Sequence, residues 1–127
     1  IKDAVKIMSQ QRMVGLPVVD SDQNVIGIIT ESDITKASLP GYYKELQNPS
    51  FIPDFDQFSQ QAKKIAHLPV RVFMTAMVYS VEEDTSRTEA ANLLFRKQLR
   101  IVPVVRAGKL VGILTPSCLC KTAMEED

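Results

Sequence analysis

The chain has 127 residues, which suffice for one domain or for two very small ones packed together. Its fifteen basic and fifteen acidic residues cancel, so no strong field attracts nucleic acid or an anionic membrane. No apolar run approaches the ~20 residues of a transmembrane helix, and no signal peptide is visible. The first residue is Ile1 rather than Met, so we expect a fragment of a longer protein.

The first 39 residues predict a helix, two strands and a second helix. Ala4, Ile7 and Met8 recur at helical spacing and predict a buried face for the first helix. The continuous apolar run in the second strand predicts that both of its faces are covered. In chain order the elements are a helix over 1–13, a strand over 16–19, a polar turn over 20–24, a strand over 25–29 and a helix over 30–38.

Residues 40–69 differ in character and predict a helical insert or linker. Three proline-containing breakers interrupt the segment, with one or two helical turns expected over 42–46. A longer helix is expected over 54–66, capped by Asp54. Its apolar stripe consists of Phe55, Phe58, Ala62 and Ile65.

Residues 70–127 predict three strands and two helices. Ser86 or Thr85 is expected to cap the first helix, and Pro116 occupies the favoured first position of the second. In order, the segment holds a lead-in over 70–75, a strand over 78–81, a helix from 86 to 98, strands over 101–105 and 110–114, and a helix from 115.

The two ends of the chain repeat one unit of helix, strand, strand and helix. Leu16-Pro17-Val18-Val19 matches Val102-Pro103-Val104-Val105, and the segment 25–30 matches 110–115. The preceding helices also align, with Ala4 matching Ala90 and Met8 matching Leu94. Such agreement in one order indicates an internal repeat whose first copy lacks the lead-in strand of the second.

The repeated Pro-Val-Val strand, the Gly-apolar-apolar-Thr turn and the Phe73-Met74-Thr75 lead-in together resemble a tandem CBS-domain pair, or Bateman module. The resemblance implies an α/β (α+β) fold of two pseudo-twofold-related βαββα repeats, the first lacking its lead-in strand. The repeats would span residues 1–39 and 70–127, with the insert over 40–69 between them. It further implies clefts between the repeats that bind AMP, ADP, ATP or S-adenosylmethionine, a homodimer, and regulation of an attached enzyme or transporter.

Thr30 and Asp33 carry two interpretations. Thr-x-x-Asp at a helix start is a capping-box pattern, in which each side chain binds the other residue's backbone N–H. A helix N-terminus also binds anions, and an Asp there can accept hydrogen bonds from ribose hydroxyls. The sequence leaves both interpretations open, and they are compatible.

The resemblance assigns roles to particular residues. Asp33 would hold the ribose, Thr30 and Ser32 would face phosphate, and Ile28 would line the base pocket. The lead-in segment Val78, Tyr79 and Ser80 would meet the base. Arg100 would contact phosphate, or would be a solvated residue at a helix end.

In the second copy Cys118 stands where Asp33 does, and a thiol is a weak hydrogen-bond partner. A phosphate would still reach Thr115 and Ser117, so we expect one competent site and one weaker one. Cys118 and Cys120 are too close for a disulfide and lack the second pair of a zinc site. We expect both to be reduced, buried apolar residues in a cytoplasmic protein.

The leading hypothesis is a regulatory module that senses an adenine nucleotide. The alternative is a structural module for dimerisation that binds no ligand. We expect no enzyme, because no nucleophile–base pair, metal cluster or paired carboxylates stand out, and His67 appears as an uninvolved helix-end residue. We also expect no nucleic-acid partner and no membrane insertion.

Overall fold

The computed structural model describes residues 1–39, 55–76 and 78–125. The chain forms two compact units, and each is described by itself. The first unit consists of residues 1–16 and 29–75, and the second of residues 17–28 and 76–127. The predicted turns over 42–46 and the predicted cap Asp54 lie outside the described residues.

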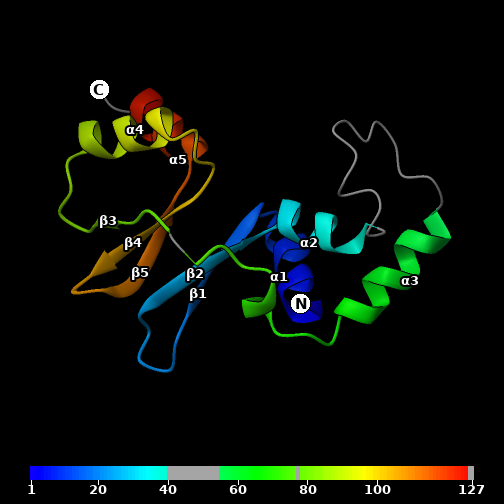
Figure 1. Cartoon of the computed structure of the whole chain (residues 1–127). Coiled ribbons are helices and arrows are strands. Elements are labelled where there is room, and N and C mark those ends of the chain that lie inside the picture. The colour runs from blue at the N-terminus through cyan, green and yellow to red at the C-terminus, as the bar shows by residue number, and fades with distance from the viewer. Residues whose placement is uncertain (40–54, 77, 126–127) are drawn as a thin grey trace. The chain divides into compact units, whose positions relative to one another are not determined.

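The first unit is helical apart from strand ends. It contains α1 (Lys2–Gln11), α2 (Glu31–Ser38), α3 (Phe55–Ile65) and a short 3-10 helix (Val70–Val72) (Figure 1). Helix α2 packs against α3, and the Lys2 N–H donates to the Ala66 carbonyl at 3.0 Å, which ties α1 to the end of α3. The buried apolar residues of this unit include Ala4, Met8, Ala37 and Ile65.

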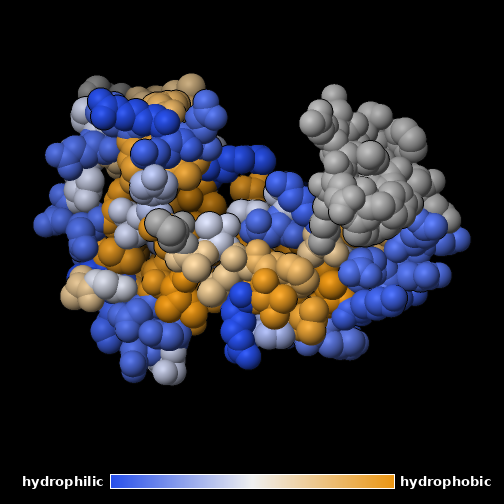
Figure 2. All heavy atoms as spheres, in the orientation of Figure 1, coloured by the Kyte–Doolittle hydropathy of each residue, from blue (hydrophilic) through white to orange (hydrophobic). Residues whose placement is uncertain are grey.

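The helices of this unit confirm the periodicity with two corrections, of which the first is Phe55 at the start of α3, predicted in the apolar stripe but 72% exposed. Ala4 and Met8 are buried as predicted, but Ile7 is 45% exposed. Positions 4 and 8 lie on one stripe of the helix, whereas position 7 is displaced toward the solvent side of α1. Figure 2 shows apolar atoms gathered over α1 and the neighbouring 3-10 helix, where Val5, Ile7, Leu68 and Val72 are exposed.

Strands β1 (Gly15–Val19) and β2 (Val25–Thr30) form a two-stranded sheet around a polar turn. Asp20 Oδ1 accepts hydrogen bonds at 2.9 Å from the N–H groups of Asp22 and Asn24, which closes the turn. The bond from the Asn24 backbone is the main reason that the pKa of Asp20 is lowered. The prediction that both faces of β2 are covered is wrong at Ile26, which is 39% exposed.

The second unit packs two helices on one side of a three-stranded sheet (Figure 1). Strand β3 (Val81–Glu82) pairs in parallel with β4 (Val102–Arg106), which pairs antiparallel with β5 (Lys109–Leu114). Helices α4 (Arg87–Arg96) and α5 (Pro116–Glu125) cover the sheet. Its core is formed by Val81, Ala90, Leu94 and Val102, with Leu93, Leu99, Val104, Leu114 and Leu119 packed against them.

The β1–β2 turn joins the second unit through β5. The Leu110 N–H donates to the Gln23 carbonyl at 3.0 Å, and Lys109 Nζ donates to the Asp22 carbonyl at 3.2 Å. The β4–β5 turn requires left-handed backbone at Ala107 and Gly108, with φ values of 53° and 82°. A glycine adopts the second of these conformations without strain.

The mixed α/β fold that the resemblance implies is confirmed, with two differences in detail. Regular strand structure begins at Val81, because residues 78–80 lack ladder pairing. Cys118 and Cys120 are free, but they are exposed rather than buried. Leu119, which lies between them in α5, packs against the core.

Candidate functional site

The predicted site residues Thr30 and Asp33 lie together where β2 turns into α2. The Thr30 N–H donates to Asp33 Oδ2 at 2.9 Å, and the Asp33 N–H donates to Thr30 Oγ1 at 3.1 Å. Both halves of a capping box are therefore formed, and Thr30 is the N-cap residue. The structural interpretation of the Thr-x-x-Asp pattern is confirmed.

The capping box leaves one oxygen of the Asp33 carboxylate without a hydrogen bond among the described residues. Asp33 is half-buried, and within the described part of the chain its Oδ1 atom makes no hydrogen bond. The Glu31 N–H donates to the Val14 carbonyl at 2.9 Å, so this group is engaged in the fold. Fewer N–H groups are therefore open to an anion than a bare helix terminus would offer.

The other two predicted residues of this region are close in the chain. Ile28 is a buried residue of β2, two positions before the cap, and it is 9% exposed. Ser32 is exposed on the first turn of α2, between the two residues of the capping box. The structure thus brings a carboxylate and two hydroxyls to one helix turn, which follows the buried residues Ile28 and Ile29 of β2.

The corresponding turn of the second unit is built differently. The Cys118 N–H donates to Thr115 Oγ1 at 3.3 Å, which reproduces half of the capping box. The Thr115 hydroxyl in turn contacts Cys118 Sγ at 3.1 Å and Ser117 Oγ at 3.3 Å. No carboxylate is present at this position, so the turn has no charged acceptor for a hydroxyl group.

The remaining predicted residues all belong to the second unit. Val78 is half-buried, whereas Tyr79, Ser80 and Arg100 are exposed. The Tyr79 ring lies under the ammonium group of Lys97, whose Nζ atom is 5.3 Å from the ring centroid. Such a contact is a cation–π interaction, and it places a positive charge beside the aromatic residue predicted to meet a base.

Two electrostatic features of the second unit, a single lysine and an ion pair, were not predicted from the sequence. One is Lys97 itself, which a helical pattern marks only as a solvated residue. The other is a bidentate pair in which Arg106 donates to the two oxygens of Glu83 at 2.5 and 2.7 Å. The opposite charges of Glu83 and Arg106 near the ends of β3 and β4 could have indicated an ion pair. Only the register of these two strands shows that the two residues lie side by side.

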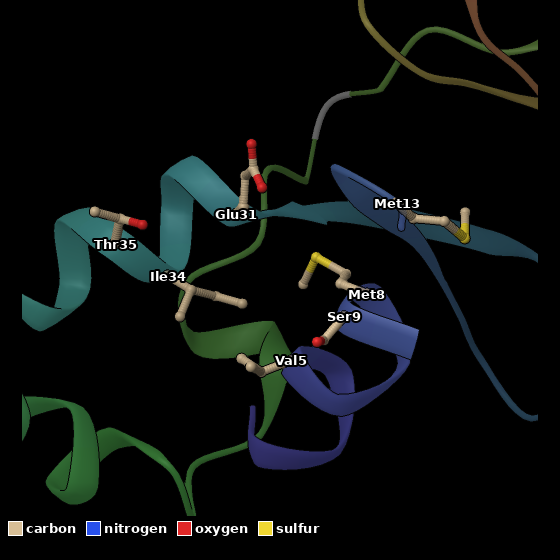
Figure 3. Close-up of a pocket in the computed structure, with 7 residues that line it drawn as sticks. All are labelled: Val5, Met8, Ser9, Met13, Glu31, Ile34 and Thr35. Carbon is tan, nitrogen blue, oxygen red and sulfur yellow. The ribbon is translucent and has the colours of Figure 1, made fainter. Parts of the chain in front are cut away.

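A hollow lies between α1 and α2 in the first unit (Figure 3). Its volume is about 250 Å³. In Figure 3 apolar side chains of both helices face the space, with polar ones at its edge. We call it the α1–α2 hollow, and it is lined by Val5, Met8, Ser9, Met13, Glu31, Ile34 and Thr35.

The described residues hold no group of three or more His, Cys, Asp or Glu side chains that could bind a metal ion. Among the helices of the described segments, none is long and apolar enough to cross a membrane. His67 lies just beyond the end of α3, and it is exposed.

Comparison with known proteins places these features in a family. The model of the CBS domain matches residues 1–40 and 70–125. The chain is 29% identical over 134 residues to the Arabidopsis thaliana protein CBSX2, described as CBS domain-containing and chloroplastic, covering 98% of this chain and 56% of the relative. It is 26% identical to the inosine-5'-monophosphate dehydrogenase of Methanocaldococcus jannaschii, covering 91% of this chain and 18% of that enzyme.

Solved structures show the same fold. A crystal structure of CBSX2 in complex with AMP superposes with a TM-score of 0.72 at 25% identity, covering 98% of this chain and 81% of that one. The CBS domain pair of protein MJ0100, crystallised with 5'-methylthioadenosine and S-adenosyl-L-methionine, gives a TM-score of 0.67 at 25% identity, covering 98% and 82%. The chain spans 56–63% of the length of the first curated relatives that it matches.

Proposed function

This chain belongs to the CBS-domain family, and from that premise we propose that it is a regulatory module that binds an adenosine-containing nucleotide. AMP in the CBSX2 crystal and S-adenosylmethionine in the MJ0100 crystal support this class of ligand. The candidates remain AMP, ADP, ATP and S-adenosylmethionine. No catalytic role is assigned to any residue.

The observation that carries the proposal is the half-used carboxylate of Asp33. Oδ2 holds the cap, while Oδ1 would accept hydrogen bonds from the ribose hydroxyls. The Thr30 and Ser32 hydroxyls on the same turn would face the phosphate. A carboxylate acceptor makes roughly twice as strong a hydrogen bond as a neutral one, which favours this turn over its counterpart.

The counterpart turn supports a single competent site. Thr115 and Ser117 would give a phosphate only neutral hydroxyl partners, and the Thr115 hydroxyl already contacts Cys118 Sγ. We therefore propose that nucleotide binds strongly at the Asp33 turn and weakly, if at all, at the second turn.

The residues Ile28, Val78, Tyr79, Ser80 and Arg100 are proposed as further contacts on the resemblance. The exposed Tyr79 ring offers a surface for stacking a base, and Lys97 beside it would favour an anionic ligand. Substitution of Tyr79 by Ala would test this part separately from the Asp33 turn.

The wider role proposed for the module is regulation of another domain. The match to a small part of a dehydrogenase supports an attached enzyme as the regulated partner. A ligand that binds one conformation of the module more tightly than another would shift the population toward the conformation that it binds better. We further propose that two chains pair as a homodimer, while a cytoplasmic location stays a prediction.

The test is isothermal titration calorimetry with the four ligands on the wild type and on Asp33→Asn. The Asn side chain keeps an acceptor for the Thr30 N–H, so the cap survives while the charge is lost. We expect at least roughly tenfold weaker binding, because hydrogen bonds to charged groups contribute about 1.5–3 kcal/mol. Asp84→Asn removes a carboxylate from an exposed turn of the other unit and serves as the matched control.

A second candidate function is favoured by the complete capping box. Thr30 and Asp33 each accept a hydrogen bond from the other's backbone N–H, so capping of α2 alone explains why these residues occur at this turn. A purely structural module would bind none of the four ligands, and Asp33→Ala would lower stability without changing any ligand response. Absence of binding by the wild type would select this alternative, whereas equal binding by the wild type and Asp33→Asn would mean that a ligand binds without the Asp33 carboxylate.

A further inference from the structure

Lys97 ends helix α4 in a backbone conformation that the fold holds in place. It is the C-cap residue of the helix, and Gln98 follows it with a left-handed φ of 52°. The Gln98 N–H donates to the Phe95 carbonyl at 3.4 Å, and the Leu99 N–H donates to the Leu94 carbonyl at 2.9 Å. These two bonds form a Schellman motif, and Leu99 packs against the core. The point from which the Lys97 side chain starts is therefore set by the second unit itself.

This helix ending does not require a lysine. The repeat that aligns α1 with α4 places Gln11, the last residue of α1, at the position of Lys97. Helix α1 ends in the same way, because Arg12 has a φ of 54° and the Met13 N–H donates to the Met8 carbonyl at 2.9 Å. A neutral side chain thus serves the equivalent helix end, so the capping geometry does not explain the charge of Lys97.

The Lys97 side chain reaches the segment that precedes β3. Its Nζ atom lies 5.3 Å from the centroid of the Tyr79 ring, within the roughly 6 Å of a cation–π contact. Tyr79 is 48% exposed with this contact formed, so the ring still offers surface to a ligand. A positive charge therefore lies beside the ring that is proposed to stack on the base.

The neighbouring charges add to that of Lys97 rather than cancel it. Arg96 and Arg100 flank it in the chain, and both are exposed. Among the described residues Lys97 forms no ion pair, and the carboxylate of Glu83 is held by Arg106. A ligand that binds at Tyr79 thus meets an uncompensated positive charge.

The candidate ligands respond to such a charge in opposite ways. AMP, ADP and ATP carry negatively charged phosphate at the 5′ carbon of the ribose, whereas S-adenosylmethionine carries a positively charged sulfonium at the same carbon. A nearby ammonium group attracts the first kind of ligand and repels the second.

We propose that Lys97 is a specificity-determining residue that selects anionic adenine nucleotides over S-adenosylmethionine. The inference rests on the proposed function, because it requires that the base is bound at Tyr79. Lys97 exerts this preference through its charge, and the preference should weaken as salt is added, since the group is exposed.

The first experiment compares S-adenosylmethionine with S-adenosylhomocysteine, which lacks one methyl group and the positive charge on sulfur. In calorimetric titrations at low ionic strength, the wild type should bind S-adenosylhomocysteine roughly two- to fourfold more tightly, the effect of one unit charge at about 5–10 Å from a cation in a medium close to water. AMP should bind more tightly than either compound.

Lys97→Gln gives the second unit the side chain that the first unit has at Gln11. This variant should weaken AMP binding by roughly fourfold or more, because the phosphate carries about two negative charges, and it should remove the difference between the two sulfur compounds. Lys97→Arg should retain both preferences. Lys121→Gln removes an exposed lysine from α5 of the same unit and is the matched control.

The possible failures of the inference and of the proposed function can be told apart. A wild type that binds AMP but binds S-adenosylmethionine equally well overturns the inference and leaves the proposed function intact. The same holds if Lys97→Gln changes AMP affinity no more than Lys121→Gln does. A wild type that binds none of the adenosine compounds overturns the proposed function and the inference with it.

A second experiment tests whether Lys97 acts together with the ring. Lys97→Gln should change AMP affinity less in a Tyr79→Ala background than in the wild type, because the ring that orients the ammonium group has been removed. Additive effects of the two substitutions would overturn the role of the Tyr79–Lys97 contact in this selection.

Discussion

Asp33 and Thr30 hold each other at the start of α2 through two reciprocal hydrogen bonds, of 2.9 and 3.1 Å. The same carboxylate is the strongest candidate for a ligand contact. A substitution at either residue therefore changes the helix cap and the proposed site together, and useful variants are those that separate the two effects.

Thr30→Val removes the capping hydroxyl and keeps the shape of the side chain. We expect the free energy of unfolding to fall by about 1 kcal/mol, because the Asp33 N–H loses its acceptor. Urea denaturation of the pure protein measures the change. Thr88→Val, at an exposed position within α4, is the control and should shift stability by only a few tenths of a kcal/mol. Equal effects of the two variants would contradict the capping role.

Cys118→Asp restores at the second turn the residue that completes the capping box at the first. We expect the free energy of unfolding to rise by up to about 1 kcal/mol, because the new carboxylate accepts a backbone N–H and lies at a helix N-terminus. On the proposed function, the calorimetric stoichiometry should also rise from one nucleotide per chain toward two.

Cys120→Asp is the control for that variant. It places the same charge two residues further along α5, on an exposed position outside the capping geometry. A stoichiometry that rises with neither variant, although Asp33 is needed for binding, would mean that the second turn lacks more than its carboxylate.

Local patterns predicted most helices and strands and the pairing of two residues of the candidate site. The Thr-x-x-Asp spacing places both residues on one helix turn, so Thr30 and Asp33 could be paired from the sequence alone. The alternation and periodicity of apolar residues likewise predicted the helices of both units and the strands β1, β2, β4 and β5.

Contacts between distant residues could not be predicted in this way. Tyr79 and Lys97 have seventeen residues between them in the chain, and only the folded unit shows that the Lys97 ammonium group lies over the Tyr79 ring. The strand predicted over 78–81 starts late because pairing with β4 begins at Val81. The exposure of Cys118 and Cys120 depends on how α5 is rotated over the sheet, which composition does not specify.

Leu94 is the most sensitive core position that we predict in the second unit. It is 2% exposed and belongs to the cluster with Val81, Ala90 and Val102. Leu94→Ala should lower the free energy of unfolding by about 2–5 kcal/mol, because it leaves a cavity in a packed core. Met124→Ala, at a residue 84% exposed on α5, should change it by less than about 0.5 kcal/mol in denaturant titrations. A similar loss for both would contradict the assignment of the core.

The Glu83–Arg106 pair predicts an acid-dependent contribution to stability. Hydrogen bonds from Arg106 lower the pKa of Glu83 below its ordinary value of 4.5, and the same pair raises the pKa of Arg106. The unfolded chain therefore binds a proton at Glu83 more readily than the folded chain does. The stabilisation is present above about pH 4.5 and is lost as the pH falls through the lowered folded-state pKa.

Glu83→Gln should consequently lower the melting temperature at pH 7 and have a smaller effect near pH 3. Both groups are exposed, so we expect a shift of no more than a few degrees. Differential scanning calorimetry at several pH values measures the difference between wild type and variant. Glu82→Gln, at the neighbouring exposed residue of β3, is the control. A gap between wild type and Glu83→Gln that widens toward pH 3 would contradict the lowered pKa, because protonated Glu and Gln are nearly equivalent partners for Arg106.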